Sequence, residues 1–285
     1  MHLKILKIVL GKIGLYKYLI KMDILMSLFK SNLKLLAKKI FYLNFVTKFF
    51  GRICFQPLYK TFRLIKSSKR FCASLWVDWH KEVVDVWMLK KNEKIYLEAL
   101  DTSKDILIKR KKFIKENLLP KNTGGGGNEA LLFFLVRLIN AKKVLETGVE
   151  AGASSQSILT SLDYNGGGKL YSSDLAFILN EQQVGKLVSD EFYNSWFLTH
   201  KGDKENIPKI FEKEKNFDLI YYDSDKSYES KKWFYEEIKK NPLPKILVYD
   251  DIDRDSFFSE FVNYLNCKYR VFGNTGVIFF DSSYF

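Results

Sequence analysis

Acidic side chains gather directly after two apolar runs in the second half of the chain. Asp223 ends the first run, with Lys226 three residues later, and Asp250 and Asp251 end the second. Three carboxylates brought together would repel one another, and a divalent cation held by oxygen ligands is the natural compensation. All-oxygen ligation with waters retained favours Mg²⁺, with Mn²⁺ or Ca²⁺ as alternatives. Such a cation could grip a substrate hydroxyl, lower the hydroxyl pKa and orient it.

Lys226 is the candidate acid–base residue of this group, with Asp223 as its neighbour in the chain. It could take the hydroxyl proton only if burial and the cation depress the lysine pKa towards neutrality. The alternative interpretation is a surface lysine that opens a helix.

A glycine turn with an acid before it follows an earlier apolar run. Gly148 and Gly152 allow positive φ and leave no Cβ, so a ligand can lie against the backbone. Glu146 falls at the expected carboxyl end of a strand, where an acid suits an amine or hydroxyl better than a phosphate. Ser154 can cap the next helix, whose positive N-terminal end would face the same position.

The spacing of this turn argues against two common nucleotide sites. A dinucleotide site needs G-x-G-x-x-G, and a phosphate loop needs Gly-Lys-Ser/Thr opening a helix. The turn has three residues between its glycines, and the glycine-rich run that ends at Lys169 precedes a strand and lacks the hydroxyl.

Strands and helices alternate from Glu129 onward, which predicts a parallel sheet covered by helices on both faces. The expected strands are 143–147, 169–173, 196–201, 217–222, 245–249, 269–272 and 277–280. The expected helices are 129–139, 154–162, 181–188, 204–214, 228–240 and 254–265. A short Gly/Asn turn joins the last two strands, so they form an antiparallel hairpin. The sequence therefore predicts a doubly wound, mostly parallel, Rossmann-like sheet of seven strands.

Two further acids follow strands of this predicted sheet, whose carboxyl ends meet at one crevice. Asp174 could accept both hydroxyls of a ribose. Asp203 could accept the exocyclic amine of adenine, and capping of the next helix is the alternative for this residue.

The E-x-G-x-x-x-G-x-S pattern from Glu146 to Ser154 resembles the first motif of class I S-adenosylmethionine-dependent methyltransferases. The run from Asp223 to Lys226 and the later Tyr-Asp-Asp resemble the cation-dependent O-methyltransferases of the caffeoyl-CoA and catechol type, from about residue 124 to the C-terminus. Those families usually place Asn where Asp251 stands. The paired acids also resemble bacterial macrocin-type sugar O-methyltransferases, which commonly carry His at the position of Lys226.

The resemblance implies roles for the residues already singled out. The cofactor S-adenosylmethionine would be held by Glu146, Gly148, Ser154 and Asp174, with Gly152 and Asp203 beside them. The metal would be held by Asp223, Asp250 and Asp251, with Lys226 as the catalytic lysine. We predict methyl transfer to a metal-bound hydroxyl of a saccharide or lipid-linked glycan. The alternatives are a small phenol or catechol acceptor, and a non-catalytic membrane-associated module with a degenerate methyltransferase fold.

The basic charge of the chain lies in its first quarter. Residues 1–70 contain 16 Lys and Arg and one acid, Asp23, whereas the whole chain carries +13. A basic amphipathic segment on an anionic membrane surface fits this pattern. Packing against the rest of the chain or against a second subunit in a homodimer is the alternative. Nucleic acid is disfavoured as a partner, because no recognised binding motif accompanies the charge.

We expect three segments: a basic helical extension at 1–70, a helical cap with a glycine-rich hinge at 71–123, and the methyltransferase domain at 124–285. The three cysteines, Cys54, Cys72 and Cys267, are widely spaced and include no C-x-x-C, which favours reduced thiols. We therefore expect a cytoplasmic protein, peripheral at the inner face of the membrane.

Overall fold

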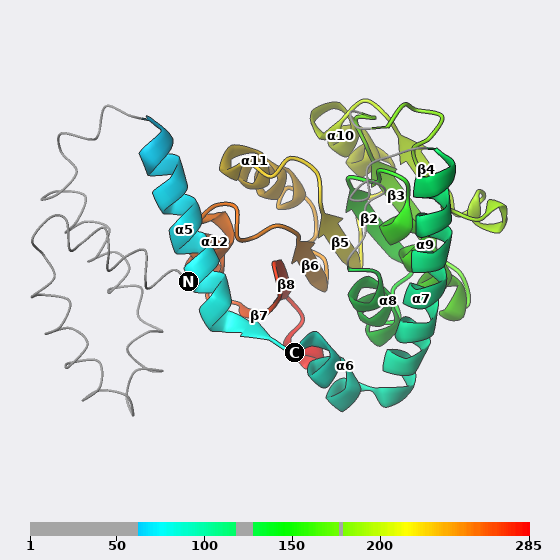
Figure 1. Cartoon of the computed structure of the whole chain (residues 1–285), viewed down its shortest axis with the longest axis horizontal. Coiled ribbons are helices and arrows are strands. Elements are labelled where there is room, and N and C mark those ends of the chain that lie inside the picture. Colours follow the sequence, from blue (N-terminus) through cyan, green and yellow to red (C-terminus); the bar gives the residue numbers. More distant parts are fainter. Residues whose placement is uncertain (1–61, 118–127, 177–178) are drawn as a thin grey trace, which may run out of the picture. The chain divides into compact units, whose positions relative to one another are not determined.

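The computed structural model describes residues 62–117, 128–176 and 179–285 (Figure 1). Most of the basic extension, Cys54 and the glycine run at 124–127 lie outside the described residues. The predictions made for those segments therefore stay predictions. Among the described residues, no helix is long and apolar enough to cross a membrane.

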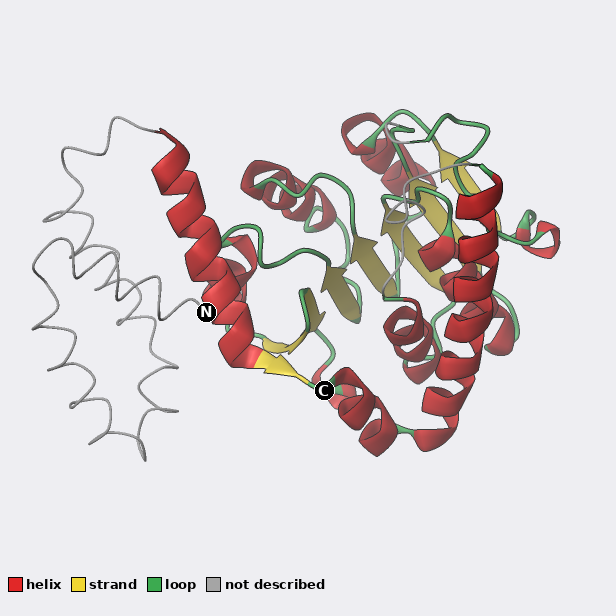
Figure 2. Cartoon of the chain, in the orientation of Figure 1, coloured by secondary structure: helices red, strands yellow, loops and turns green. Residues whose placement is uncertain are grey.

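An eight-stranded sheet organises the described chain, with the strand order β1-β7-β8-β6-β5-β2-β3-β4 (Figures 1 and 2). All neighbouring strands are parallel except β8, which runs antiparallel to β6 and β7. The strands are β1 Lys81–Glu82, β2 Lys143–Thr147, β3 Lys169–Ser173, β4 Trp196–Thr199, β5 Leu219–Tyr222, β6 Ile246–Tyr249, β7 Lys268–Phe272 and β8 Thr275–Phe279. This order confirms the predicted doubly wound sheet with a C-terminal hairpin. The eighth strand is the two-residue β1, which the sequence pattern did not reveal.

Helices cover the sheet on both faces. They are α5 Phe62–His80, α6 Val84–Lys91, α7 Glu93–Glu116, α8 Glu129–Leu138, α9 Ala153–Tyr164, α10 Asp203–Lys213, α11 Tyr228–Ile238 and α12 Phe257–Leu265. Two short 3₁₀ turns, Asp190–Phe192 and Ser282–Tyr284, complete the described elements.

The central strands β5 and β6 are apolar and buried at every position, because both of their faces are covered. In β5, Leu219 and Tyr221 pack into the cluster that contains α8 and α9. Their neighbours Ile220 and Tyr222 point to the opposite face and pack with α10, α11 and α12. The polar groups at the strand ends are therefore held between two packed layers.

The direction in which the chain progresses through the sheet changes at β2. From β2 the chain adds β3 and β4 on one side, and it then adds β5 and β6 on the other. Open α/β sheets bind ligands outside the carboxyl ends of the strands at such a switch point. The candidate residues must therefore be sought after Thr147, Ser173, Tyr222 and Tyr249.

Two expectations about local structure are wrong. The helix expected at 181–188 is a series of turns, because backbone N–H groups there bond elsewhere: Gly185 N donates to Glu150 O and Leu187 N to Ala151 O. Ser154 does not cap α9, which begins at Ala153 after Gly152, a residue in the left-handed region at φ 93°. The Ser154 hydroxyl is used at the end of β2 instead.

Candidate active site

The loop from β2 to α9 passes very close to the end of β5. Gly148 has φ 77°, and a Cβ added there would lie 2.4 Å from the carbonyl oxygen of Asp223. A side chain at this position would push the two loops apart. Gly148 therefore places the backbone of the first loop directly beside the acidic cluster that follows β5.

Glu146 is fully buried and bonds to three serine hydroxyls. Its carboxylate accepts from Ser154 at 2.5 Å, Ser155 at 2.6 Å and Ser172 at 2.8 Å. Burial raises the pKa of Glu146, and the three hydroxyl donors oppose that rise. The carboxylate joins β2 to α9 and β3. Glu146 and Ser154, which the resemblance gave as cofactor-holding residues, bond to each other in this structure.

Asp174 holds the glycine loop from the end of β3. One carboxylate oxygen accepts from the backbone N–H groups of Val149 at 2.7 Å and Glu150 at 3.0 Å, and the other accepts from Ala176 N at 2.5 Å. A carboxylate has about four acceptor positions, so roughly one remains. The structure thus leaves room for one ribose hydroxyl rather than the two that we expected.

Leu175 is a candidate residue that the sequence pattern did not single out. It follows Asp174 directly, and 62% of its side chain is exposed. An exposed leucine at the carboxyl edge of a sheet offers an apolar surface to a planar ring. The sequence feature that could have identified Leu175 is its position directly after Asp174, the acid that follows β3.

Asp203 lies on the first turn of α10 and bonds to serine hydroxyls. It accepts from Ser173 Oγ at 2.7 Å and from Ser224 Oγ. Burial raises the Asp203 pKa, and the two hydroxyl donors oppose the rise. The N-cap residue of α10 is Gly202, and each Asp203 carboxylate oxygen accepts one serine hydroxyl. Asp203 therefore links the loops after β3 and β5.

Asp223, Asp250 and Asp251 do lie together, and Lys226 lies among them. The Lys226 ammonium contacts the Oδ1 of Asp223 and is 3.9 Å from Asp250 Oδ2 and 3.7 Å from Asp251 Oδ2. It also donates to the Asp223 carbonyl oxygen at 3.0 Å. We call these four residues the Lys226 cluster.

The second oxygen of each carboxylate in the Lys226 cluster is engaged by a neutral donor. Tyr221 OH donates to Asp223 Oδ2 at 2.9 Å, and Asn274 Nδ2 donates to Asp251 Oδ1 at 2.8 Å. Asp250 Oδ1 accepts from Asn128 Nδ2 at 3.0 Å and Thr275 Oγ1 at 2.9 Å. Each carboxylate is therefore fixed with its other oxygen facing Lys226.

Asn128 stands at the N-cap position of α8, where an asparagine normally bonds to its own helix. It makes no cap bond there, and its side chain reaches Asp250 and Thr275 instead. Sequence reasoning did not single out this residue, because its contacts depend on how the start of α8 packs against the sheet.

The pKa values of Lys226 and Asp223 are both raised in the cluster. Burial alone would lower the Lys226 pKa, but the three carboxylates raise it above its ordinary value. Burial raises the Asp223 pKa to about 7, with a further rise from Asp250 and an opposing effect of Lys226. The role of Lys226 as a base, which requires a bound cation to depress its pKa, stays a prediction, whereas the Asp223 pKa lies near neutral pH.

The cluster does not fit a divalent cation as it stands. No group of three or more His, Cys, Asp or Glu side chains in the described part of the chain is arranged to hold a metal ion. The oxygens that we predicted as ligands of Mg²⁺ face the Lys226 ammonium. No catalytic step is therefore derived through a metal.

A buried lysine supports the cluster from α11. Lys231 is fully buried, and its ammonium donates to the Asp251 carbonyl oxygen at 3.1 Å and to Asp255 Oδ2 at 3.1 Å. Asp251 has φ 52°, in the left-handed region that non-glycine residues rarely adopt. Lys231 thus helps to hold the backbone of Asp251 in an unfavourable conformation.

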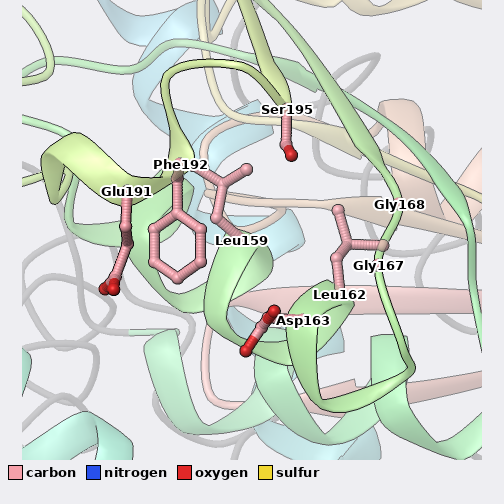
Figure 3. Close-up of a pocket in the computed structure, with 8 residues that line it drawn as sticks. All are labelled: Leu159, Leu162, Asp163, Gly167, Gly168, Glu191, Phe192 and Ser195. Carbon is pink, nitrogen blue, oxygen red and sulfur yellow. The ribbon is translucent and has the colours of Figure 1, made fainter.

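A shallow pocket lies at the opposite edge of the sheet (Figure 3). Its lining includes Leu162, Asp163 and Gly168, near the amino end of β3, together with Phe192 and Ser195. This pocket is separate from the carboxyl strand ends where the predicted site residues gather.

Residues 145–252, less than half of the chain, match a family model described as a methyltransferase domain. The resemblance to class I methyltransferases is confirmed over these residues. No curated protein matches the chain.

Several solved structures are similar to this chain at low sequence identity. An O-methyltransferase from Bacillus cereus in complex with SAH is 15% identical, with a TM-score of 0.47, covering 63% of this chain and 90% of that one. The O-methyltransferase TomG from Streptomyces achromogenes, in complex with SAM, is 17% identical, with a TM-score of 0.45, covering 61% and 89%. An SAH-bound methyltransferase from Podospora anserina is 14% identical, with a TM-score of 0.49, covering 61% and 86%.

Replacing Lys231 by Met should lower the free energy of unfolding by about 3 kcal/mol, because Asp255 would lose its buried partner. Urea unfolding followed by circular dichroism measures this change. The matched control is Lys232→Met, at the exposed neighbouring position, which should cost less than about 0.5 kcal/mol. Equal losses for the two variants would contradict the supporting role of Lys231.

Stability should depend on pH through Asp223. Its folded pKa of about 7 exceeds the ordinary value of 3.8, so its protonation favours the folded state. This contribution is complete below pH 3.8 and is lost as pH rises through about 7. The unfolding free energy of the natural chain relative to Asp223→Asn should therefore fall between these two pH values and then level off.

Urea unfolding at a series of pH values measures this difference. Asp101→Asn is the control, because 80% of the Asp101 side chain is exposed. A constant difference between the natural chain and Asp223→Asn over that range would refute the assignment of a raised pKa.

Proposed function

We propose that this chain is an S-adenosylmethionine-dependent O-methyltransferase. The observation that carries the proposal is the close approach of the glycine loop to the acidic cluster, with Gly148 against the Asp223 carbonyl. A methyl donor on the loop and a hydroxyl at the cluster would then be neighbours. The methyltransferase-domain match over residues 145–252 supports the donor.

The residues at the carboxyl strand ends fit S-adenosylmethionine. Gly148 is half-buried after the end of β2, and Asp174 retains about one acceptor position for a ribose hydroxyl. Leu175 offers an apolar surface for the adenine ring. When bound, S-adenosylmethionine supplies an electrophilic methyl group on a sulfonium.

The Lys226 cluster would prepare the acceptor hydroxyl. The Lys226 ammonium donates a hydrogen bond to the acceptor oxygen and stabilises the negative charge that develops there. Asp223 accepts the hydroxyl proton, because its raised pKa makes it a competent base near neutral pH. Most of the rate would come from holding donor and acceptor in line.

We further propose a saccharide or lipid-linked glycan as the acceptor. The support is the basic charge of residues 1–70, which would keep the enzyme at an anionic membrane surface on the cytoplasmic side. The alternative role of this segment is packing against a second subunit in a homodimer, with its lysines in contact with solvent.

Isothermal titration tests the donor site. The full chain should bind S-adenosylmethionine with a Kd between about 1 μM and 1 mM, the usual range of enzyme substrates. Asp174→Ala should weaken binding at least ~10-fold, because it frees the loop and removes the ribose acceptor. Asp163→Ala, at the pocket of Figure 3, is the control and should leave the Kd unchanged.

Asp174→Asn keeps one acceptor oxygen, so an intermediate loss would separate ligand contact from loop damage. If millimolar S-adenosylmethionine gives no heat of binding, the proposed function is contradicted.

Transfer of a radiolabelled methyl group tests the acceptor. Label should enter a lipid-linked glycan fraction more readily when the lipid is presented in anionic vesicles than in neutral ones. High salt should remove this preference, because it screens the basic segment. Labelling of catechol with none in the glycan fraction would show that a small phenol is the acceptor.

A further inference from the structure

The ammonium group of Lys226 lies between the three aspartate side chains of the Lys226 cluster. One carboxylate oxygen of each aspartate faces the Lys226 ammonium. The Asp223 oxygen is in direct contact with it, and the Asp250 and Asp251 oxygens lie 3.9 Å and 3.7 Å away. The ammonium donates a further bond to the Asp223 carbonyl at 3.0 Å. Lys226 thus hydrogen-bonds to Asp223, lies beyond hydrogen-bond distance of Asp250 and Asp251, and keeps 31% of its side chain exposed.

The carboxylates cannot easily turn away from this point. Asp250 is fixed on its other oxygen by Asn128 and Thr275, and Asp251 by Asn274. These donors belong to the start of α8 and to the β7–β8 hairpin, so two elements distant in sequence set the direction of both side chains. A buried charge that is fixed in this way needs a counter-charge at the same point.

Two positive side chains supply that counter-charge. Lys226 lies at the shared point, and Arg254 Nε is 3.6 Å from Asp251 Oδ1 on the outer side. Together they offset two of the three negative charges. Mg²⁺ sits at about 2.0–2.1 Å from its oxygen ligands, so it would need the volume that the ammonium now fills.

We infer that Lys226 is the resident cation of this cluster, so that a divalent cation binds tightly only when Lys226 is removed. For the methyl transfer, which rests on the proposed function, this makes Lys226 the group that replaces a metal beside the acceptor oxygen. The acceptor O–H bond breaks and its proton passes to Asp223. The oxygen forms a bond to the methyl carbon as the S–C bond breaks, and that electron pair stays on sulfur as a neutral thioether.

Binding of Mn²⁺ to the full-length protein tests this inference without any acceptor. Electron paramagnetic resonance measures free Mn²⁺ after exhaustive EDTA treatment and removal of the chelator, with and without S-adenosylmethionine. The natural chain should show no saturable binding up to about 1 mM, the range of the weakest protein cation sites. Lys226→Met should bind Mn²⁺ at least ~10-fold more tightly, because three fixed carboxylates then lack their partner.

Three variants serve as controls. Lys226→Arg keeps a positive charge and should bind as weakly as the natural chain, and Lys232→Met removes an exposed lysine and should also change nothing. Lys226→Met combined with Asp251→Asn should lose part of the gained affinity. Thermal melting monitors folding, and Mg²⁺ should raise the melting temperature of Lys226→Met but not that of the natural chain.

Micromolar binding of Mn²⁺ to the natural chain, or equal affinity in Lys226→Met, overturns the inference. If Lys226→Met does not fold, Lys226→Gln provides the same measurement. Failure of the chain to bind S-adenosylmethionine would remove the proposed function and leave the metal measurement interpretable by itself.

Discussion

Three aspartate carboxylates fixed within reach of one ammonium group set the requirements for the rest of this structure. Negative charges at such short distances interact strongly when water is partly excluded, so each needs a donor on every side. Lys226 provides the shared positive charge, and the outer hydrogen-bond donors are Tyr221, Asn128, Thr275 and Asn274. These outer donors come from β5, the start of α8 and the β7–β8 hairpin, so the site forms only when these elements are assembled around it.

Acids elsewhere at the same edge of the sheet are balanced in a different manner. Glu146 and Asp203 are surrounded by serine hydroxyls, and Asp174 accepts backbone N–H groups. Neutral donors hold these carboxylates in place, and Asp174 still keeps about one acceptor position. The strand-end acids therefore divide into those that connect the loops and those of the Lys226 cluster, which share one ammonium group.

The sequence predicted the sheet well because its signals are local. The bounds of β2 and β3 follow from short apolar runs between breaks, and the final hairpin follows from its Gly/Asn turn. The helix expected at 181–188 failed because tertiary hydrogen bonds from Gly185 and Leu187 outweigh local helical spacing.

Alternation of strands and helices also indicated which acids would meet, since the carboxyl ends of parallel strands share one edge. The partner of each carboxylate could not be predicted in this way. Glu146 and Ser154 were both interpreted as ligand-facing, yet they bond to each other across eight residues. Asn128 reaches Asp250 over 122 residues, a contact that depends on how α8 packs and leaves no mark in the local pattern.

The turn between β7 and β8 gives this chain an unusual sensitivity to length. Hairpin turns are ordinarily the places where a protein tolerates inserted residues. Here Asn274 bonds to the Asp251 side chain, and its carbonyl accepts Ile252 N at 2.9 Å, so the turn is tied directly to the Lys226 cluster. Changes of length in this turn, whether natural or engineered, would therefore disturb the Lys226 cluster. Sequence diversity should accumulate in other loops instead.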